Sequence, residues 1–335
     1  MAKFSNSITD IDGILVGQVQ DMTAMTGCTV IIYPEGAIGG VDQRGGAPGT
    51  RETDLLRPMH MVEKIHAVLL TGGSAFGLDA AGGVMKFLEE KKIGFNTGVA
   101  LVPIVPAAVI FDLGLGQSDI RPSAEMGYQA CQSATHLSPK QGNFGAGTGA
   151  SVGKIFGMNQ AMKSGIGTAS IELGGNLRVA AIMVVNAFGD ILEPKSSTII
   201  AGARTLQKGP LKIGLENYFA NSLETMKSFV GKTVLNIANR QNTVIGVVAT
   251  NAALTKEEAN KVAQMAHNGL AKTICPAHTM FDGDTIFVMA TGKHHADVSL
   301  IGAYAAEVVA QAIVNAVMFA EPIGGLPSAQ SKIKS

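Results

Sequence analysis

The sequence predicts one large domain that combines buried β-strands with apolar α-helices, and three observations support this fold class. Short β-branched runs such as Val244 to Ala249 (VIGVVA) are bounded by polar residues, as buried strands are. Longer segments near the C-terminus carry apolar residues at helical spacing. Hydrophobic residues make up 46% of the 335 residues and charged residues only 16%, which is enough to bury a large core.

Further strands are expected earlier in the chain. Residues 11–35 contain two strand-like runs, and His66 to Thr71 (HAVLLT) forms a third. The runs Thr168 to Leu173 and Asn176 to Val185 flank Gly174-Gly175. Because paired glycines tolerate the positive φ of a primed turn, these two runs predict a β-hairpin.

Four longer helices are expected, and a short helix-like piece lies near Asn221 to Phe229. An apolar segment ends near Lys91, and residues 122–134 also have a helical pattern. Thr255 and Glu258 form a capping box ahead of apolar residues at helical spacing. The segment Val298 to Phe319 is apolar almost all round, apart from a stripe formed by Glu307, Gln311 and Asn315. This pattern predicts a buried helix with one polar stripe.

Two glycine-rich stretches are candidates for a site. Residues 72–77 (GGSAFG) follow a strand and precede a helix, but they match neither the dinucleotide fingerprint nor the nucleophile elbow. A turn that lets strand and helix pack closely is the favoured interpretation. The polar loop at 41–54 (VDQRGGAPGTRETD) is compatible with catalytic lining and with a plain connection.

Composition excludes several classes of protein. Lys plus Arg equals Asp plus Glu, at 26 each, which leaves no basic field for nucleic acid. Three separated cysteines without a CxxC motif favour a reducing compartment. The N-terminus has no apolar signal region, and no uninterrupted apolar run reaches about 18 residues. We therefore expect a soluble cytoplasmic protein with no membrane partner, and its low charge makes oligomerisation plausible.

Thr243 stands where a polar, turn-like stretch meets the strand at 244–249. A cut between Asn242 and Thr243 would leave a hydroxyl and a new α-amine on one residue. An α-amine has a pKa of about 7.7–8.0, so near neutral pH it can take the proton of the hydroxyl. The same hydroxyl could make the cut by attacking the Asn242 carbonyl. The alternative is an ordinary turn that leads into the strand.

Three further polar residues are candidates for the same chemistry. Asp282 and Asp284 are two residues apart, so in an extended chain both carboxylates face the same side. The alternative is a hairpin, because Asp-Gly is a common turn pair. Metal binding by the two aspartates would need further ligands, and the sequence near them has no matching His or carboxylate cluster. Asn186 ends an apolar strand, where its amide either caps the chain or donates to an oxyanion.

Several separated motifs resemble the L-aminopeptidase/D-esterase (DmpA-type) family of self-cleaving amide hydrolases. They are GTGASVGK, SGIGTAS, VVNAFGD, NTVIGVVATNAALTKEEA and FDGDTIFVMATG. The resemblance covers almost the whole chain. It implies an α+β fold, an αββα sandwich resembling that of N-terminal nucleophile hydrolases, with residues 1–335 as a single domain. It also implies processing into chains 1–242 and 243–335, which stay together and assemble into a homo-oligomer.

The resemblance implies a role for each candidate residue. Thr243 matches the family nucleophile, directly after the cleavage point. Asn186 matches an asparagine that contacts the nucleophile or the oxyanion. Lys154, together with Asn186, would assist the oxyanion. Asp282 and Asp284 match a polar pair that orients the new amine and helps to move its proton. A carboxylate beside an ammonium favours the charged form, so the pair would position the amine rather than deprotonate it.

Some features depart from the aminopeptidase members, which tend to have Ser or Gly-Ser at the cleavage point and tyrosine in place of Lys154. Asn-Thr, Lys154 and the Asp-Gly-Asp triplet are closer to the nylon-oligomer (6-aminohexanoate oligomer) hydrolase branch. We therefore expect a threonine hydrolase that cleaves a small peptide or oligoamide and needs neither cofactor nor metal. Two alternatives are an acyltransferase on the same fold, related to ornithine acetyltransferase, and an unprocessed binding protein.

Overall fold

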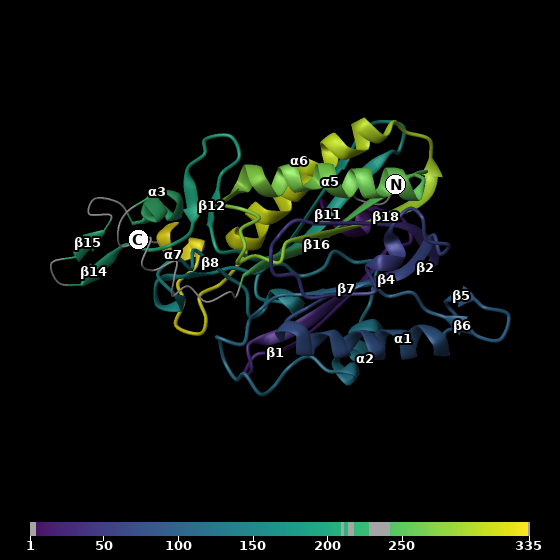
Figure 1. Ribbon diagram of the computed structural model, residues 1–335, viewed down its shortest axis with the longest axis horizontal. Helices are drawn as coiled ribbons and strands as arrows, with labels where there is room; N and C mark the ends of the chain where they lie inside the picture. Colours follow the sequence, from purple (N-terminus) through teal and green to yellow (C-terminus); the bar gives the residue numbers. More distant parts are fainter. Residues whose placement is uncertain (1–4, 209–210, 214–217, 228–241, 334–335) are drawn as a thin grey trace.

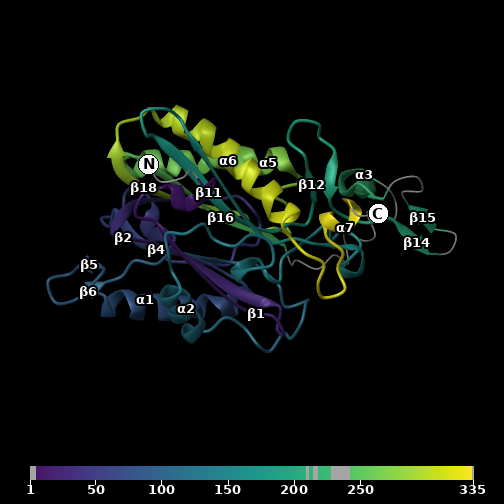
Figure 2. The same ribbon diagram turned by 180° about the vertical axis from the view of Figure 1, so that it is seen from behind.

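Strands and helices of this protein stack in four layers, with two strand layers inside and a helix pair outside each (Figure 1). The computed structural model describes residues 5–208, 211–213, 218–227 and 242–333. Helices α5 and α6 cover one strand layer, and α1 and α2 cover the other, as the reverse view in Figure 2 also shows. The predicted αββα sandwich is confirmed. Residues 228–241, just ahead of the expected cleavage point, lie outside the described residues.

The first strand layer is buried on both faces. Its strands are β10 (Ile166–Glu172), β11 (Arg178–Asn186), β16 (Thr243–Ala252) and β18 (Thr285–His294). In β11, alternate residues such as Val179 and Ala181 pack against α5 and α6, whereas Ala180 and Ile182 face the other strand layer. Because neither face meets water, this strand is apolar along its length rather than alternating.

The predicted hairpin joins the first two of these strands. β10 and β11 are antiparallel, with Ile166 opposite Val184 and Glu172 opposite Arg178. Gly174 and Gly175 have φ of +89° and +58°, the conformation that favours glycine in such a turn.

The second strand layer continues from the first through one long strand, β2 (Thr26–Gln43). The C-terminal part of β2 pairs with β18, and its N-terminal part pairs with β1 and β4. The other strands of this layer are β1 (Leu15–Asp21), β4 (Lys64–Thr71), β7 (Ala107–Val109) and β3 (Thr50–Arg51). The core between the two layers contains Ile31, Val68 and Leu70 from this side.

The four longer predicted helices are present, the short one expected near Asn221 corresponds to α3, and α7 is a further short helix. These helices are α1 (Ala80–Glu90), α2 (Ala124–Gln132), α3 (Ser222–Lys227), α5 (Lys256–Thr273), α6 (Val298–Met318) and α7 (Ala329–Ile333). The capping box ahead of α5 forms as expected, because Thr255 accepts from the Glu258 amide and the Glu258 side chain accepts from the Thr255 amide.

Helix α6 is a core helix. Within the described chain it is long and apolar enough to cross a membrane by length and composition, and 61% of its apolar stretch is buried. It packs on α5, β10 and β11. One residue of the predicted polar stripe contacts β10, because the Asn315 side chain donates to the Thr168 carbonyl oxygen.

Most of the shorter strands form small sheets outside the main one. They are β5 (Phe95–Asn96), β6 (Leu101–Val102), β8 (Ser151–Val152), β9 (Met162–Lys163), β12 (Asp190–Leu192), β13 (Ile199–Ala201), β14 (Leu206–Lys208), β15 (Leu211–Ile213) and β17 (Ile274–Cys275), with 3₁₀ turns at Ile8–Asp10, Asp54–Leu56, Ser74–Asp79, Gly145–Gly147 and Met158–Gln160.

Two helix glycines give a matched test of this packing. A Cβ at Gly269 in α5 would lie 2.0 Å from the Ala306 carbonyl oxygen of α6, whereas a Cβ at Gly82 in α1 would meet nothing within 4 Å. We expect Gly269→Ala to lower the free energy of unfolding by about 1–3 kcal/mol through overpacking. Gly82→Ala should raise it by about 0.5–1 kcal/mol through helix propensity. Urea denaturation followed by circular dichroism measures both, and equal effects would contradict this account of the α5–α6 contact.

Candidate active site

Thr243 is the first residue of β16 and lies at the end of the space between the two strand layers. Its backbone pairs with Asn186, the last residue of β11. Because side chains alternate along a strand, Thr243 points the same way as Ile245 and Val247, which are in the core between the layers. Thr243 is only 5% exposed. The register therefore places its hydroxyl in a protected position at the mouth of the sandwich.

The carbonyl group ahead of Thr243 is held by two donors. The Gly283 amide donates to the Asn242 carbonyl oxygen at 3.0 Å, and the Thr243 hydroxyl also donates to this oxygen. Glycine is required at 283 because a Cβ there would lie 2.8 Å from Thr243 Oγ1. The chain at this point brings a hydroxyl and a polarised carbonyl group of one peptide bond into contact.

Asp282 and Asp284 lie on either side of Gly283 and both hold the backbone near Thr243. Asp284 Oδ1 accepts from the Val244 amide at 2.9 Å, next to the candidate nucleophile. Asp282 Oδ1 accepts from the Phe188 amide at 3.3 Å. Burial, together with the charge of Asp284, raises the pKa of Asp282 to about 6.

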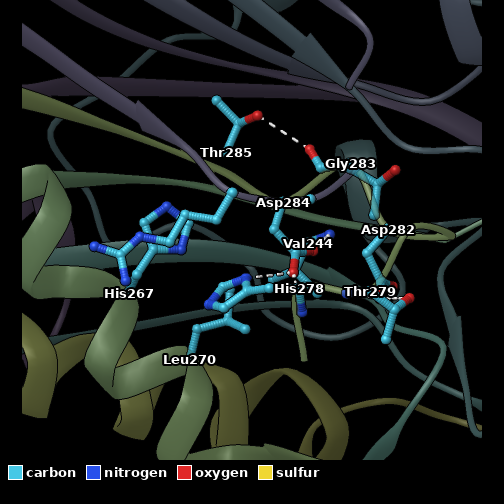
Figure 3. A network of polar contacts seen from close by, with 12 residues as sticks. Val244, His267, Leu270, His278, Thr279, Asp282, Gly283, Asp284 and Thr285 are labelled. Atoms are coloured by element: carbon cyan, nitrogen blue, oxygen red, sulfur yellow. Dashed lines mark hydrogen bonds and ion pairs between the residues drawn. The ribbon is translucent and has the colours of Figure 1, made fainter. Parts of the chain in front are cut away.

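Two residues of the loop before β18 supply further donors to these carboxylates (Figure 3). His278 Nδ1 lies 2.8 Å from Asp284 Oδ2, which also accepts from the His278 amide at 3.1 Å. Thr279 donates from its hydroxyl and its amide to Asp282 Oδ2, at 2.5 and 3.0 Å. All four oxygens of the two carboxylates thus accept hydrogen bonds from the protein.

A second histidine supports the first from α5. The rings of His267 and His278 meet edge to face, with centroids 4.8 Å apart (Figure 3). Burial lowers the pKa of His267 to about 4, so its ring is neutral near pH 7. A neutral ring can pack against His278 without electrostatic repulsion, and His267 Nε2 lies 3.0 Å from the Asp42 carbonyl oxygen.

Lys154 reaches the site through Asn186. Its Nζ donates to Asn186 Oδ1 at 2.6 Å and to the Asn186 carbonyl oxygen at 3.1 Å. Burial lowers the pKa of Lys154 to about 7, although the charges of Asp282 and Asp112 oppose this shift. These contacts hold the amine next to the cross-strand partner of Thr243.

The Asn186 side chain has further contacts besides Lys154. Its Oδ1 also accepts from the Ser151 amide at 3.1 Å, and its Nδ2 donates to the Phe111 carbonyl oxygen at 2.9 Å. These contacts make Asn186 the residue that holds Lys154 in place. Its expected contact with the nucleophile or the oxyanion stays a prediction.

A second buried lysine stabilises the loop behind Asn186. Lys163 is fully buried, and its Nζ donates to the carbonyl oxygens of Gly147, Ala150 and Ser164. Burial lowers its pKa to about 7 as well. Ser151 follows Ala150 directly, so Lys163 helps to position the Ser151 amide, which donates to Asn186 Oδ1.

A cavity of about 120 Å³ opens beside Thr243. Its lining comes from the loop after β2, from the turn after β4, from β7 and from the start of β16: Ala47, Pro48, Gly49, Ser74, Ala75, Val109, Phe111, Asn242 and Thr243. The turn at 72–74 is fixed in place because the Gly73 amide donates to Asp112 Oδ1 at 2.7 Å and the Ser74 amide donates to the Ile110 carbonyl oxygen at 3.0 Å. A substrate group therefore has a preformed place next to the hydroxyl.

The structure brings all five sequence-predicted residues to this site: Thr243, Asn186, Lys154, Asp282 and Asp284. Among the described residues, no group of three His, Cys, Asp or Glu side chains is placed to hold a metal ion. Sequence reasoning missed His278, Thr279 and the amide of Gly283. Polar residues within six positions of Asp284 were the available signal, but only folding of the loop shows which of them point at the carboxylates.

The two glycine-rich stretches also contribute to the site. Within the turn at 72–77 the backbone is tightly packed, since a Cβ at Gly77 would lie 1.9 Å from the Gly72 carbonyl oxygen. The turn also has a second role, which the packing interpretation did not include: Ser74 and Ala75 line the cavity. The loop at 41–54 supplies cavity lining as well, which was one of its two interpretations.

Comparison with known proteins identifies the family. The model of Peptidase family S58 matches residues 6–330. An uncharacterized aminopeptidase of Mycobacterium leprae (strain TN) is 40% identical, over 98% of this chain and 94% of the relative. The 6-aminohexanoate-oligomer endohydrolase of Agromyces sp. (strain KY5R) is 30% identical, over 92% of this chain and 84% of the relative.

A solved structure shows the same fold. The L-aminopeptidase D-Ala-esterase/amidase from Ochrobactrum anthropi, described as a variant of the Ntn hydrolase fold, superimposes with a TM-score of 0.69 at 19% identity. The match covers 96% of this chain and 88% of that chain. With the αββα layers described above, the resemblance inferred from the sequence motifs is confirmed. The chain belongs to peptidase family S58 and is a hydrolase of amide or peptide bonds.

Proposed function

We propose that this protein is a self-processed amide hydrolase whose nucleophile is the hydroxyl of Thr243, freed as an N-terminal residue by a cut after Asn242. The observation that carries the proposal is the pair of hydrogen bonds on the Asn242 carbonyl oxygen, one from Gly283 N–H and one from Thr243 itself. An amide donor on this oxygen favours the negative charge that develops there when a hydroxyl attacks.

The first reaction would act on the chain itself. Thr243 Oγ1 forms a bond to the Asn242 carbonyl carbon, the bond from this carbon to the Thr243 nitrogen breaks, and the hydroxyl proton ends on the released amine. Water then hydrolyses the resulting ester. The products are chains 1–242 and 243–335. They would stay together because β16 and β18, both of the shorter chain, lie between β11 and β2 of the longer chain.

The second reaction would act on substrate. The new α-amine, with a pKa of about 7.7–8.0, takes the hydroxyl proton as Oγ1 attacks a peptide or oligoamide carbonyl. The proton passes to the leaving amine, and water resolves the acyl-enzyme. Asp282 and Asp284, on the chain beside the new terminus, would orient the ammonium form, and Lys154 would stabilise the oxyanion with Asn186 holding it.

Replacing the candidate nucleophile gives the first test. We expect Thr243→Ala to run as a single band of 34.6 kDa, whereas the parent chain gives bands of about 25 and about 9.6 kDa, in proportion to 242 and 93 of the 335 residues. Amide hydrolysis should fall by at least about 10³-fold, because no other hydroxyl has the same amine beside it.

Thr243→Ser is the matched control because it keeps the hydroxyl. It should be processed into two bands and retain activity. A Thr243→Ala protein that hydrolyses amides at the parental rate would remove Thr243 from the mechanism. Gel electrophoresis and N-terminal sequencing of the small chain make the measurement.

The dependence of activity on pH tests the role of Asp282. Its pKa is raised to about 6 by burial, against which hydrogen bonds from Thr279 favour the ionised form. Thr279→Val removes the hydroxyl donor and should raise this pKa further, by about 0.7 unit for a hydrogen bond worth about 1 kcal/mol. If ionised Asp282 is required, the acidic limb of the kcat/KM profile moves to higher pH by this amount.

Thr279→Ser keeps the donor and should leave the acidic limb where it is. Identical acidic limbs in the valine and serine variants would show that ionisation of Asp282 does not limit the reaction.

His278 tests the support of Asp284. His278→Phe removes the ring donor to Asp284 Oδ2 but keeps an aromatic ring against His267. A hydrogen bond to a charged group is worth about 1.5–3 kcal/mol, so kcat/KM should fall by about 10- to 100-fold. His278→Asn retains a side-chain donor and should recover much of this loss, while thermal unfolding reports any loss of fold. Equal rates in the phenylalanine variant and the parent would contradict a positioning role for His278.

A further inference from the structure

A buried carboxylate, that of Asp112, lies next to the wall of the cavity beside Thr243. Asp112 directly follows Phe111, which lines both this cavity and a second cavity of about 10 Å³. Asp112 and Lys154 line the smaller cavity together. Phe111 therefore separates the place next to the candidate nucleophile from the place that Asp112 and Lys154 share.

The Asp112 carboxylate joins two segments that are far from it in the sequence. The residue is only 4% exposed, and both of its side-chain oxygens accept hydrogen bonds at 2.7 Å, Oδ2 from the Thr26 hydroxyl and Oδ1 from the Gly73 amide. Gly72 leaves room for it, because a Cβ there would lie 2.0 Å from Asp112 Oδ2. The residue after Gly73 is Ser74, which lines the larger cavity. Asp112 thus holds a turn that forms part of the wall beside the nucleophile.

The same stretch supports the lysine through Asn186. Asn186 Nδ2 donates to the Phe111 carbonyl oxygen at 2.9 Å, and Asn186 Oδ1 accepts from Lys154 Nζ at 2.6 Å. The loop ahead of Lys154 also packs on the carboxylate, since a Cβ at Gly149 would lie 2.8 Å from Asp112 Oδ2. Asp112 is therefore packed among the segments that carry the turn, the asparagine and the lysine.

Charge links Asp112 to two buried lysines. Burial lowers the pKa of Lys154 and of Lys163 to about 7, and the negative charge of Asp112 opposes both shifts. Asp282 acts on Lys154 in the same direction as Asp112, whereas the charge of Lys154 lowers the pKa of Lys163 further. Burial also raises the pKa of Asp112, and its two hydrogen bonds and the charge of Lys154 favour the ionised form. A buried ion is costly unless it has hydrogen bonds and an opposite charge, so the ionised forms of Asp112 and Lys154 stabilise each other.

We propose that Asp112 is a positioning residue for amide hydrolysis: it supplies a buried counter-charge that favours the protonated amine of Lys154, and it fixes the turn at 72–74 beside Thr243. The inference rests on the proposed function, in which Lys154 stabilises the oxyanion. A protonated amine stabilises a developing negative charge more strongly than a neutral amine does. Asp112 acts through these neighbours and not by contact with the reacting atoms.

Neutralising Asp112 tests the counter-charge. Asp112→Asn keeps the size of the side chain, and its amide can still bond the Gly73 N–H and the Thr26 hydroxyl, which accepts as well as donates. The pKa of Lys154 should fall when the negative charge is lost. The basic limb of the kcat/KM profile should then move to lower pH by about 0.5–1 unit, and kcat/KM on that limb should fall by about 3- to 10-fold.

The substrate for this profile is a linear 6-aminohexanoate oligomer, whose end groups do not titrate between about pH 6 and pH 9. Alanine p-nitroanilide is a second probe, because its own titration is the same for the parent and for each variant. An identical basic limb in Asp112→Asn and the parent would overturn the role of the counter-charge in the reaction.

Thr26→Val is the control for a loss of position without a loss of charge. It removes the hydroxyl donor to Asp112 Oδ2 and leaves the carboxylate in place. We expect kcat/KM to fall by the same factor at every pH of the basic limb, so the limb itself stays where the parent has it. Thr26→Ser keeps the donor and should resemble the parent.

A double-mutant cycle on thermal unfolding tests the pair of charges without any activity. It is run in the Thr243→Ala background, so that all four proteins are the same uncut chain. Asp112→Asn should lower the unfolding midpoint when Lys154 is present. In the Lys154→Met chain the opposite charge is gone, so the same substitution should be less costly by about 1–5 °C.

The outcomes separate the inference from the function on which it rests. Additive midpoints, or an Asp112→Asn chain that folds in neither background, would show that the carboxylate acts independently of Lys154 and would overturn the inference. A non-additive cycle with an unchanged basic limb would overturn the role of Asp112 in the reaction and leave the threonine hydrolase intact. Absence of Thr243-dependent hydrolysis in the parent would overturn the proposed function and this role together. A non-additive cycle, with a basic limb that moves in Asp112→Asn and stays in Thr26→Val, would support both.

Discussion

The register of β16 between β11 and β18 is the constraint on which the rest of the site depends. It sets Thr243 opposite Asn186, and it brings Val244 next to the carboxylate of Asp284. A slip by one residue would turn every side chain of the strand to the other face, so Thr243 would point at the helices. The slip is opposed because β16 is buried on both faces, and its two side-chain series differ in shape and neighbours.

The second constraint is electrostatic. Lys154 and Asp282 are buried, and burial moves their pKa values toward each other, to about 7 and about 6. Both ionised forms are costly away from water, and each is made tolerable by hydrogen bonds and by the opposite charge nearby. Burial of these groups therefore lowers the stability of the fold, and it holds groups that can gain or lose a proton near neutral pH. This is the range in which general acid–base chemistry is most effective.

Much of the fold was predictable because the strongest local signals agreed with the tertiary structure. The Gly174-Gly175 turn, the Thr255 capping box and the apolar α6 each formed where the pattern placed them. The five candidate residues were found through motifs rather than periodicity. Their convergence required strands far apart in sequence to become neighbours, which no local pattern encodes.

The parts that could not be predicted are those made by backbone placement. Gly283 contributes a backbone amide, and its lack of a side chain leaves room for Thr243. A search of the sequence for polar side chains does not find such a residue. His278 lies in a loop whose path decides whether its ring meets Asp284 or solvent. The cavity takes its walls from four separate segments, so it exists only once they are brought together.

The central place of β16 in its sheet has a consequence for assembly. A cut before Thr243 would leave this strand as the terminus of a separate chain, whose strands β16 and β18 are inserted between β11 and β2 of the other chain. While the chain is intact, the strand finds its slot at the high effective concentration of a tethered segment. Once the two pieces have been denatured and separated, recovery becomes a bimolecular reaction that slows on dilution. Processing would then make assembly of the sheet irreversible in practice. The intact peptide bond assists the first folding of the sheet, and the cut chains no longer have this assistance.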